Sequence, residues 1–196
     1  MVVAAPEKAA RRRVLDAAAA LFVVQGYAGT TLREIAAETG IKAGSIYHHF
    51  DSKDDIFVAV LADGIEVMLD AFDGTAESTD ETDTNESRLH AQVQAHLSAV
   101  FENGPYTTAH VTAFFSAPSA VRSRVVPRRD EYEARWSVLF SSLFPRASAK
   151  DRQLHRLILF GAMNATAEWF DPEGPMSISE LASAISHQFL AGFEGA

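Results

Sequence analysis

Residues 31–53 read TLREIAAETGIKAGSIYHHFDSK, and this stretch decides the fold. Thr31 and Glu34 have the spacing of a capping box, in which each side chain bonds a free backbone amide at the start of a helix. Gly40 supplies the turn at which the chain leaves the helical conformation. A second short helix is predicted over residues 43–49. Together these features predict a helix-turn-helix.

The second predicted helix has an apolar side and a polar side. Ile46 and Phe50 lie on the apolar side. The other side carries small or hydrogen-bonding side chains, namely Lys42, Ala43, Gly44, Ser45, Tyr47 and His48. A helix that enters the major groove of DNA needs such an edge, because bulky apolar groups would keep it away from bases and phosphates. We therefore expect this helix to contact DNA.

Three segments of this region resemble the N-terminal signature of the tetracycline-repressor (TetR) family. They are Thr31-Leu-Arg-Glu-Ile-Ala, Gly40-Ile-Lys-Ala-Gly-Ser-Ile-Tyr-His-His-Phe and Ser52-Lys53. The family consists of all-helical, dimeric transcription factors, mostly repressors that small ligands release from DNA. The resemblance implies that the family's DNA contacts fall on Thr31, Lys42, Gly44, Ser45, Tyr47, His48 and Lys53, with Ala43 close to the bases.

The composition is that of an ordinary soluble globular protein, with 47% hydrophobic and 22% charged residues among 196. The absence of cysteine excludes disulfides, cysteine-based zinc sites and thiol catalysis. No apolar run approaches the roughly 18 residues of a membrane span, and the N-terminus does not resemble a secretory signal. We therefore expect a cytoplasmic protein with no membrane partner.

Charge is distributed unevenly along the chain, whose net charge is −9. Residues 1–53 carry seven basic and five acidic side chains, whereas the remainder carries ten basic and 21 acidic ones. A basic head on an acidic body keeps one part attractive to phosphate and the rest repelled from it. The run Arg11 to Arg13 favours contact with the DNA backbone, and the alternative is a solvated surface.

The rest of the chain also predicts helices. Helical spacing of apolar residues indicates helices over 8–25, 53–72, 87–102, 107–116, 121–144, 150–169 and 179–193. Pro127 either kinks the helix over 121–144 or marks its true beginning. The polar, acidic stretch 73–86 predicts a mobile loop. We expect an all-α fold of about nine helices, with a DNA-binding domain over residues 1–53 and a ligand-binding and dimerisation domain over 54–196.

Enzyme chemistry has no signature in this sequence. Neither a phosphate-binding glycine loop nor a Gly-x-Ser-x-Gly elbow occurs. His90 and His96 are six residues apart, so they do not form the i, i+4 pair of a metalloenzyme. We predict that the protein is not an enzyme and that it has no catalytic residue, no metal site and no cofactor.

An effector site is expected among the aromatic side chains of the body, since such bodies usually enclose an apolar pocket. The candidate ligand-binding residues are His96, Phe101, Phe114, Phe115, Arg128, Tyr132, Trp136, Phe140 and Trp169. For His96 and the two tryptophans the alternative is ordinary packing in the core.

The nature of the effector has two sequence clues. Arg122, Arg124, Arg128, Arg129 and Arg135 concentrate positive charge in the acidic body; they either pair with Asp130, Glu131 and Glu133 or receive a phosphate-bearing head group. Residues 169–175 also resemble a segment of TetR members that sense acyl-CoA thioesters. We hypothesise an acyl-CoA-like or other hydrophobic effector, and the alternative is a repressor of an efflux system that responds to lipophilic drugs.

The last two long helices are expected to form a homodimer, because in the resembled family they pack as a four-helix bundle across the two-fold axis. In the helix over 150–169, Leu154, Leu157, Ile158 and Gly161 share one face. The apolar and small residues beyond the core-facing stripes are Phe160, Ala162, Met163, Ala167, Ala182, Phe189, Leu190 and Phe193. The expected partners are a second copy, a palindromic double-stranded DNA operator and the effector. The alternative to a ligand-responsive repressor is a helical structural or adaptor protein without DNA binding.

Overall fold

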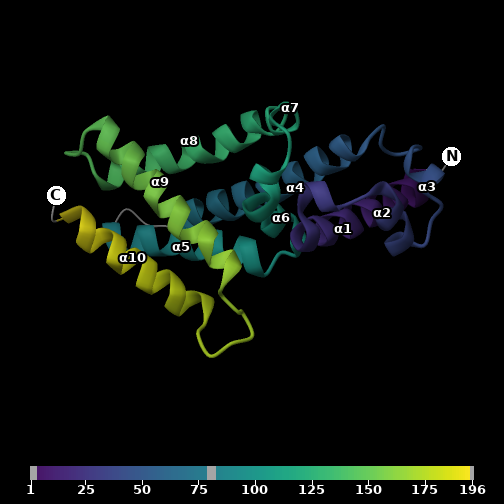
Figure 1. Cartoon of the computed structure of the whole chain (residues 1–196). Helices are drawn as coiled ribbons and strands as arrows, with labels where there is room; N and C mark the ends of the chain where they lie inside the picture. The colour runs from purple at the N-terminus through teal and green to yellow at the C-terminus, as the bar shows by residue number, and fades with distance from the viewer. Residues whose placement is uncertain (1–3, 79–82, 195–196) are drawn as a thin grey trace. The chain divides into compact units, whose positions relative to one another are not determined.

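The computed structural model describes residues 4–78 and 83–194, with side chains described for 7–78 and 83–192. This part of the chain contains ten α-helices, two 3-10 helices and no strand, which confirms the all-α prediction. The helices are α1 (Ala4–Gly29), α2 (Leu32–Thr39), α3 (Ala43–Ile46), α4 (Lys53–Ser78), α5 (Asn85–Phe101), α6 (Pro105–Ala113), η1 (Phe114–Ser116), α7 (Ser119–Arg122), α8 (Val126–Leu143), α9 (Ala149–Ala165), η2 (Thr166–Glu168) and α10 (Ile178–Glu194), shown in Figure 1.

The chain forms two compact units. Unit 1 comprises Met1–Ile65 and Gly104–Pro127, and unit 2 comprises Glu66–Asn103 and Arg128–Ala196. The boundary between them falls inside α4, so this helix contributes its first half to unit 1 and its second half to unit 2. The sequence predicts a DNA-binding domain over residues 1–53 and a body over 54–196. This division describes function and not compact packing, so it stays a prediction.

In unit 1, α1 packs against α6 and α2, and α2 against α3. The core of this unit includes Phe22 and Phe57, which are fully buried and whose ring centroids are 4.9 Å apart. The helical path of α1 is broken at Gly26, whose φ of 67° and ψ of 177° are non-helical. This break follows directly on the helix predicted over residues 8–25, and its positive φ suits glycine.

In unit 2, α10 packs against α5 and also contacts α9. Its core is formed by large side chains of α5, α8 and α9, among them Leu97, Trp136 and Met163, which are fully buried. Trp136 belongs to an aromatic cluster with Phe72 and Phe160, at centroid distances of 5.5 Å in both cases.

The predicted loop over residues 73–86 is wrong in its first part, because α4 continues to Ser78. Arg135 of α8 explains the continuation. Its Nε donates to both carboxylate oxygens of Asp73, at 2.8 Å and 3.0 Å, which anchors this turn of α4. Residues 79–82 lie outside the described part of the chain. At the other end of the predicted loop, Thr84 caps α5 by accepting a hydrogen bond from the Ser87 amide.

The stretch 121–144 is two helices rather than one kinked helix. The short α7 ends at Arg122, and α8 begins at Val126, so Pro127 stands in the first turn of α8. This is the position where a missing amide hydrogen costs least, because first-turn amides have no partner within the helix.

The inward face of α9 is the opposite of the predicted one. Phe160 and Met163 are buried, whereas Leu154, Leu157 and Ile158 are exposed by 52%, 47% and 54%. Both faces of this helix are apolar, so helical periodicity alone could not decide between them. The larger side chains turn inward, where Phe160 stacks with Tyr132 at a centroid distance of 6.0 Å.

Among the helices of the described residues, none combines the length and the apolar character that a membrane span requires.

Candidate functional site

The first helix of the helix-turn-helix begins with the predicted capping box. The Glu34 amide donates to Thr31 Oγ1 at 3.2 Å, and the Thr31 amide donates to Glu34 Oε2 at 2.8 Å. The Thr31 hydroxyl also donates to this carboxylate at 2.7 Å, and these bonds lower the pKa of Glu34 from its ordinary value. Thr31 therefore has a structural role, and as an exposed residue it remains available to DNA.

The turn between α2 and α3 is made by Gly40, in the left-handed conformation with φ 70° and ψ 18°. Its amide donates back to carbonyls of α2, and the Ile41 amide donates to Ala36 at 3.1 Å. This arrangement satisfies the free carbonyls at the end of α2 and requires glycine. The helix that follows is shorter than the predicted 43–49, because α3 ends at Ile46 and residues 47–49 form a turn.

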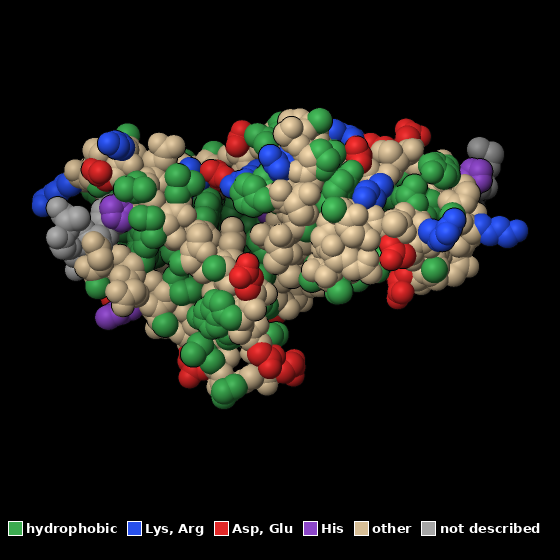
Figure 2. Space-filling view, in the orientation of Figure 1, with side chains coloured by type: hydrophobic (Ala, Val, Ile, Leu, Met, Phe, Trp, Pro, Cys, Tyr) green, Lys and Arg blue, Asp and Glu red, His purple; other side chains and the backbone are tan. Residues whose placement is uncertain are grey.

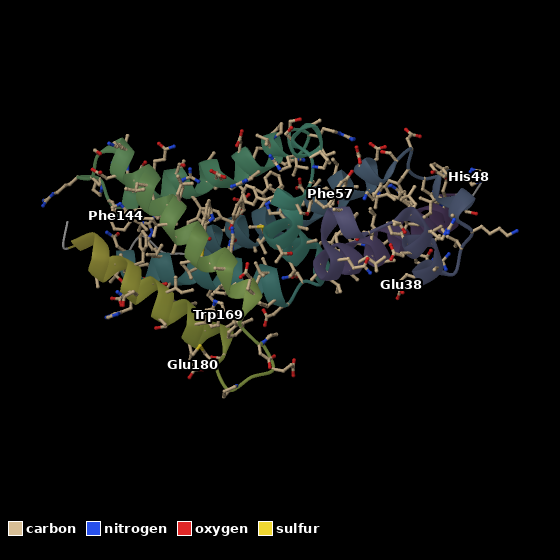
Figure 3. All side chains as sticks on the ribbon, in the orientation of Figure 1. Glu38, His48, Phe57, Phe144, Trp169 and Glu180 are labelled. Atoms are coloured by element: carbon tan, nitrogen blue, oxygen red, sulfur yellow. The ribbon has the colours of Figure 1, made fainter. Side chains whose placement is uncertain are left out.

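The side chains of the second helix divide as the sequence predicts. Ile46 is fully buried and Phe50 is 6% exposed, so these two hold α3 in place. The predicted contact residues Lys42, Ala43, Gly44, Tyr47 and His48 are exposed, and Ser45 is half-buried. His48 lies at one end of unit 1 in Figure 3. A β-carbon added at Gly44 would meet no atom within 4 Å, so this edge is open to an approaching backbone.

Lys53 makes structural contacts within unit 1. Its ammonium donates to the carbonyls of Tyr27 at 2.8 Å and Thr30 at 3.0 Å, and it lies 4.1 Å from the centre of the Tyr27 ring. The Tyr27 hydroxyl donates to Asp54, and desolvation together with this carboxylate raises the pKa of Tyr27 to about 12. The expected phosphate contact of Lys53 stays a prediction, and the ammonium already has two partners when DNA is absent.

The arginine run of α1 divides between two environments. The Arg12 guanidinium binds Asp16 at 3.0 Å and Asp63 at 3.5 Å, and it lies over the Tyr106 ring. Arg11 points elsewhere, because its guanidinium lies 4.8 Å from the centre of the Phe50 ring. Arg12 therefore supports the fold, and Arg11 belongs to the surface around α3.

A hollow of about 310 Å³ lies beside α3 in unit 1. It is lined by Glu7, Lys8 and Arg11 of α1 and by His48 and His49. Four of these five side chains can donate a hydrogen bond to a phosphate oxygen. Arg11 belongs to the arginine run expected to contact the DNA backbone, whereas Lys8 and His49 were not predicted, since nothing in the local sequence indicates that the start of α1 meets the turn after α3.

In unit 2, His96 is the centre of a buried polar network. Its Nδ1 accepts from the Tyr132 hydroxyl at 2.9 Å, and its Nε2 donates to Asn164 Oδ1 at 3.1 Å. Burial lowers the pKa of His96 to about 4, so the imidazole is neutral at pH 7. Burial also raises the pKa of Tyr132, which keeps the phenol protonated. This network joins α5, α8 and α9.

The structure brings together only some of the predicted ligand-binding residues. His96, Tyr132, Trp136 and Phe140 are buried in one aromatic cluster, which Phe72 and Phe160 complete. Phe101 pairs instead with Phe170, at a centroid distance of 4.9 Å. Trp169 is 61% exposed at the end of η2 and is labelled in Figure 3. Phe114 and Phe115 belong to unit 1, and Phe115 is 71% exposed.

The five arginines considered as a head-group site all have partners. Arg124 binds Asp55, Arg129 binds Glu133 and Arg135 binds Asp73. Arg128 binds Glu66 at 3.0 Å and Glu131 at 2.6 Å, and Arg122 donates to the Phe115 and Ala117 carbonyls. This geometry favours the ion-pair alternative, although three of the five carboxylate partners come from α4 rather than from residues 130–133.

Two family models match the chain. Residues 14–60 match the model described as bacterial regulatory proteins, tetR family, and residues 82–193 match the tetracyclin repressor-like C-terminal domain. The second match alone covers more than half of the chain. This chain belongs to the TetR family.

Three individual proteins are similar to this chain, two of them over most of its length. The HTH-type transcriptional repressor KstR2 of Mycolicibacterium smegmatis is 28% identical over 199 residues, covering 95% of this chain and 90% of that protein. KstR2 of Rhodococcus jostii is 49% identical over 51 residues, covering 26% of this chain and 25% of that protein. The crystal structure of AibR in complex with isovaleryl coenzyme A and operator DNA has a TM-score of 0.78 at 20% identity, covering 91% of this chain and 97% of that one. The likeness to AibR shows a shared fold.

As a TetR-family member, the protein is a DNA-binding transcriptional regulator and not an enzyme. Both predictions are confirmed, and the alternative of an adaptor without DNA binding is not supported. Among the described residues, no group of three or more histidine, aspartate or glutamate side chains could hold a metal ion.

Lys42 and Lys53 are expected to respond differently to alanine substitution. Lys42→Ala should leave the unfolding temperature unchanged and reduce the log–log salt dependence of DNA binding by about one unit per subunit, because one phosphate contact is lost. Lys53→Ala should also lower stability, by about 1–2 kcal/mol, because its ammonium bonds two carbonyls in unit 1. Thermal unfolding and DNA titrations at several salt concentrations test both expectations. A Lys53→Ala protein as stable as the unmodified one would contradict the structural role.

Proposed function

We propose that the protein is a homodimeric repressor which a hydrophobic or acyl-CoA-like effector releases from a palindromic operator. The observation that carries this proposal is the exposed polar edge of α3, held by buried Ile46 and Phe50 on a scaffold that belongs to the TetR family. Because such an operator lies in the bacterial cytoplasm, we also propose a cytoplasmic location.

The DNA-facing residues divide by chemistry. Lys42, Tyr47 and His48 are long, exposed donors that suit phosphates, so they supply affinity with little sequence choice. Ala43, Gly44 and Ser45 are short, so they let the start of α3 approach the base edges. Two such surfaces related by a two-fold axis suit half-sites about 34–36 Å apart, in successive major grooves.

The dimer proposal rests on an exposed apolar stripe along α9. Leu154, Leu157, Ile158, Gly161, Ala162 and Ala165 are all exposed and recur at helical spacing. Figure 2 shows hydrophobic side chains along the visible face of this helix. A stripe of this length leaves much apolar area in water in a single chain, and a self-complementary interface would bury it. Of the interface residues expected from the sequence, Ala162 lies in the stripe, whereas Phe160, Met163 and Ala182 are buried within the chain, so the prediction was wrong for these three. The side chain of Phe193 lies outside the described residues.

A charged side chain in this stripe is expected to dissociate the dimer. Ile158→Glu places a carboxylate where the proposed interface is apolar, so sedimentation should show monomers at micromolar concentration and DNA affinity should fall at least tenfold. Val138→Glu is the matched control, because Val138 is 72% exposed on α8 and lies outside the stripe. If Ile158→Glu and Val138→Glu both keep the oligomeric state of the unmodified protein, α9 is not the interface.

The effector proposal rests on the aromatic cluster of unit 2 and on the family. The cluster around His96 gathers aromatic rings from α4, α5, α8 and α9, so a ligand that enters between these helices would meet mainly apolar side chains. AibR has been crystallised in complex with isovaleryl coenzyme A, and this supports a thioester as the class of ligand for this chain. The other candidate is a plain lipophilic molecule, which the same apolar cluster would admit.

Thermal shift measurements with acyl-CoAs of graded chain length, beside the matching free acids, test the effector proposal. A thioester should raise the unfolding temperature and release a bound operator fragment, and the free acid should do so less. Equal responses to acid and thioester would favour the lipophilic alternative. No response to any of them would rule out the acyl class.

A further inference from the structure

A hollow of about 170 Å³ lies in unit 2 between α8 and α9. Ser137, Phe140 and Ser141 of α8 line one side, and Ala149, Arg152, Gln153 and Arg156 of α9 line the other. Its volume is several times the roughly 30 Å³ that one water occupies in the liquid, so a small polyatomic ion fits. This hollow is separate from the aromatic cluster around His96, although the buried ring of Phe140 belongs to both.

Positive charge in this hollow exceeds negative charge. Arg156 is only 7% exposed, and its Nη1 donates to Glu133 Oε2 at 2.7 Å. The same carboxylate also binds Arg129, through Nε at 3.0 Å from Oε1. Two guanidinium groups therefore share one carboxylate. A guanidinium has five N–H donors, so the Glu133 contact leaves Arg156 with further donors for a second anion.

Arg152 is fixed at the same hollow by backbone contacts. Its Nη1 donates to the Phe144 carbonyl at 3.2 Å and to the Ala147 carbonyl at 2.6 Å. These carbonyls orient the guanidinium and leave its formal charge uncompensated. Asp151 of the same turn is engaged by Ser148, whose hydroxyl donates to its carboxylate at 2.6 Å. Ala149 lines the hollow and is the first residue of the 17-residue helix α9. The positive end of the dipole of this helix therefore also lies at the hollow.

We propose that this hollow binds a phosphate group. Two guanidinium groups one helical turn apart and the Gln153 side chain line it beside the beginning of α9. Guanidinium groups bind phosphate oxygens through charge-assisted hydrogen bonds. None of the five arginines between residues 122 and 135 lines this hollow.

The phosphate can come from two sources with the same chemistry. One is free inorganic phosphate, and binding of this ion does not depend on the proposed function. The other is the phosphate ester of a nucleotide-bearing effector such as coenzyme A, and this assignment rests on the proposed function.

Calorimetric titrations of the full chain at constant ionic strength, in a buffer free of phosphate, test the site. The probes are inorganic phosphate, coenzyme A and 3′-dephospho-coenzyme A. Arg152→Gln removes a lining guanidinium, and Arg146→Gln is the matched control because Arg146 is exposed and does not line the hollow. Unfolding temperatures of both variants verify that they are folded.

At least one phosphate-bearing probe is expected to bind saturably, about tenfold more weakly to Arg152→Gln and unchanged to Arg146→Gln, because one charged hydrogen-bond donor is lost. Preference for coenzyme A over its dephospho form assigns the hollow to an effector, and binding of inorganic phosphate alone assigns it to the free ion. No saturable binding, or equal losses in both variants, would overturn the site. Phosphate binding without any release of DNA by acyl-CoAs would refute the proposed effector and leave the site standing.

Discussion

A Gly64→Ala variant is expected to unfold at a clearly lower temperature than the unmodified protein. A β-carbon at this position of α4 would lie 2.5 Å from the Tyr106 carbonyl oxygen and 2.8 Å from its carbon. These are backbone atoms of α6, so no side-chain rotation relieves the clash and the two helices must separate. Overpacking of this kind costs about 1–3 kcal/mol, and the higher helix propensity of alanine offsets about 1 kcal/mol of it. We therefore expect a net loss of up to about 2 kcal/mol.

Gly74 provides the matched control in the same helix. A β-carbon there meets no atom within 4 Å, so Gly74→Ala should keep or raise stability, by up to about 1 kcal/mol. Urea or thermal unfolding of the two variants measures the difference. Equal stability of the two variants would mean that α4 and α6 are not in close contact at Gly64.

The second large effect concerns pH. Burial lowers the pKa of His96 to about 4, whereas an unfolded histidine titrates near pH 6.5. The unfolded state therefore binds this proton more readily than the folded state. The contribution of His96 to stability is fully present above about pH 6.5 and is lost as the pH falls toward 4. Two to three pKa units correspond to about 3 kcal/mol.

Carboxylates also titrate in the acidic part of this window, so the prediction concerns a difference between variants. His96→Gln keeps a polar group beside Tyr132 and removes the titration, and its unfolding free energy should fall by about 3 kcal/mol less between pH 6.5 and 4. His187→Gln is the control, because His187 is exposed on α10. Parallel stability curves for all three proteins would contradict the buried, neutral state of His96.

Local sequence signals predicted the helix-turn-helix well. The capping box of Thr31 and Glu34, the left-handed Gly40 and the buried pair Ile46 and Phe50 all depend on residues within a few positions of one another. Such features are encoded in the stretch itself, so a single sequence is enough to find them.

Features that depend on distant contacts could not be predicted in the same way. The α4 turn after residue 72 is held by Arg135, more than sixty residues further on, and composition alone indicated a loop. The inward face of α9 was mistaken because both faces are apolar. Lys53 was assigned to phosphate alone, since its contacts with Tyr27 and Thr30 require the fold of unit 1.

Selection of bound sequences from random DNA, followed by sedimentation of the complex, tests the proposed function most directly. We expect a palindromic site with half-site centres about 34–36 Å apart, or a multiple of one helical turn, and an even number of chains on each site. The sequence preference should fall on the bases that Ala43, Gly44 and Ser45 can reach. A protein that selects no sequence, or that binds a single half-site as one chain, would contradict the proposal.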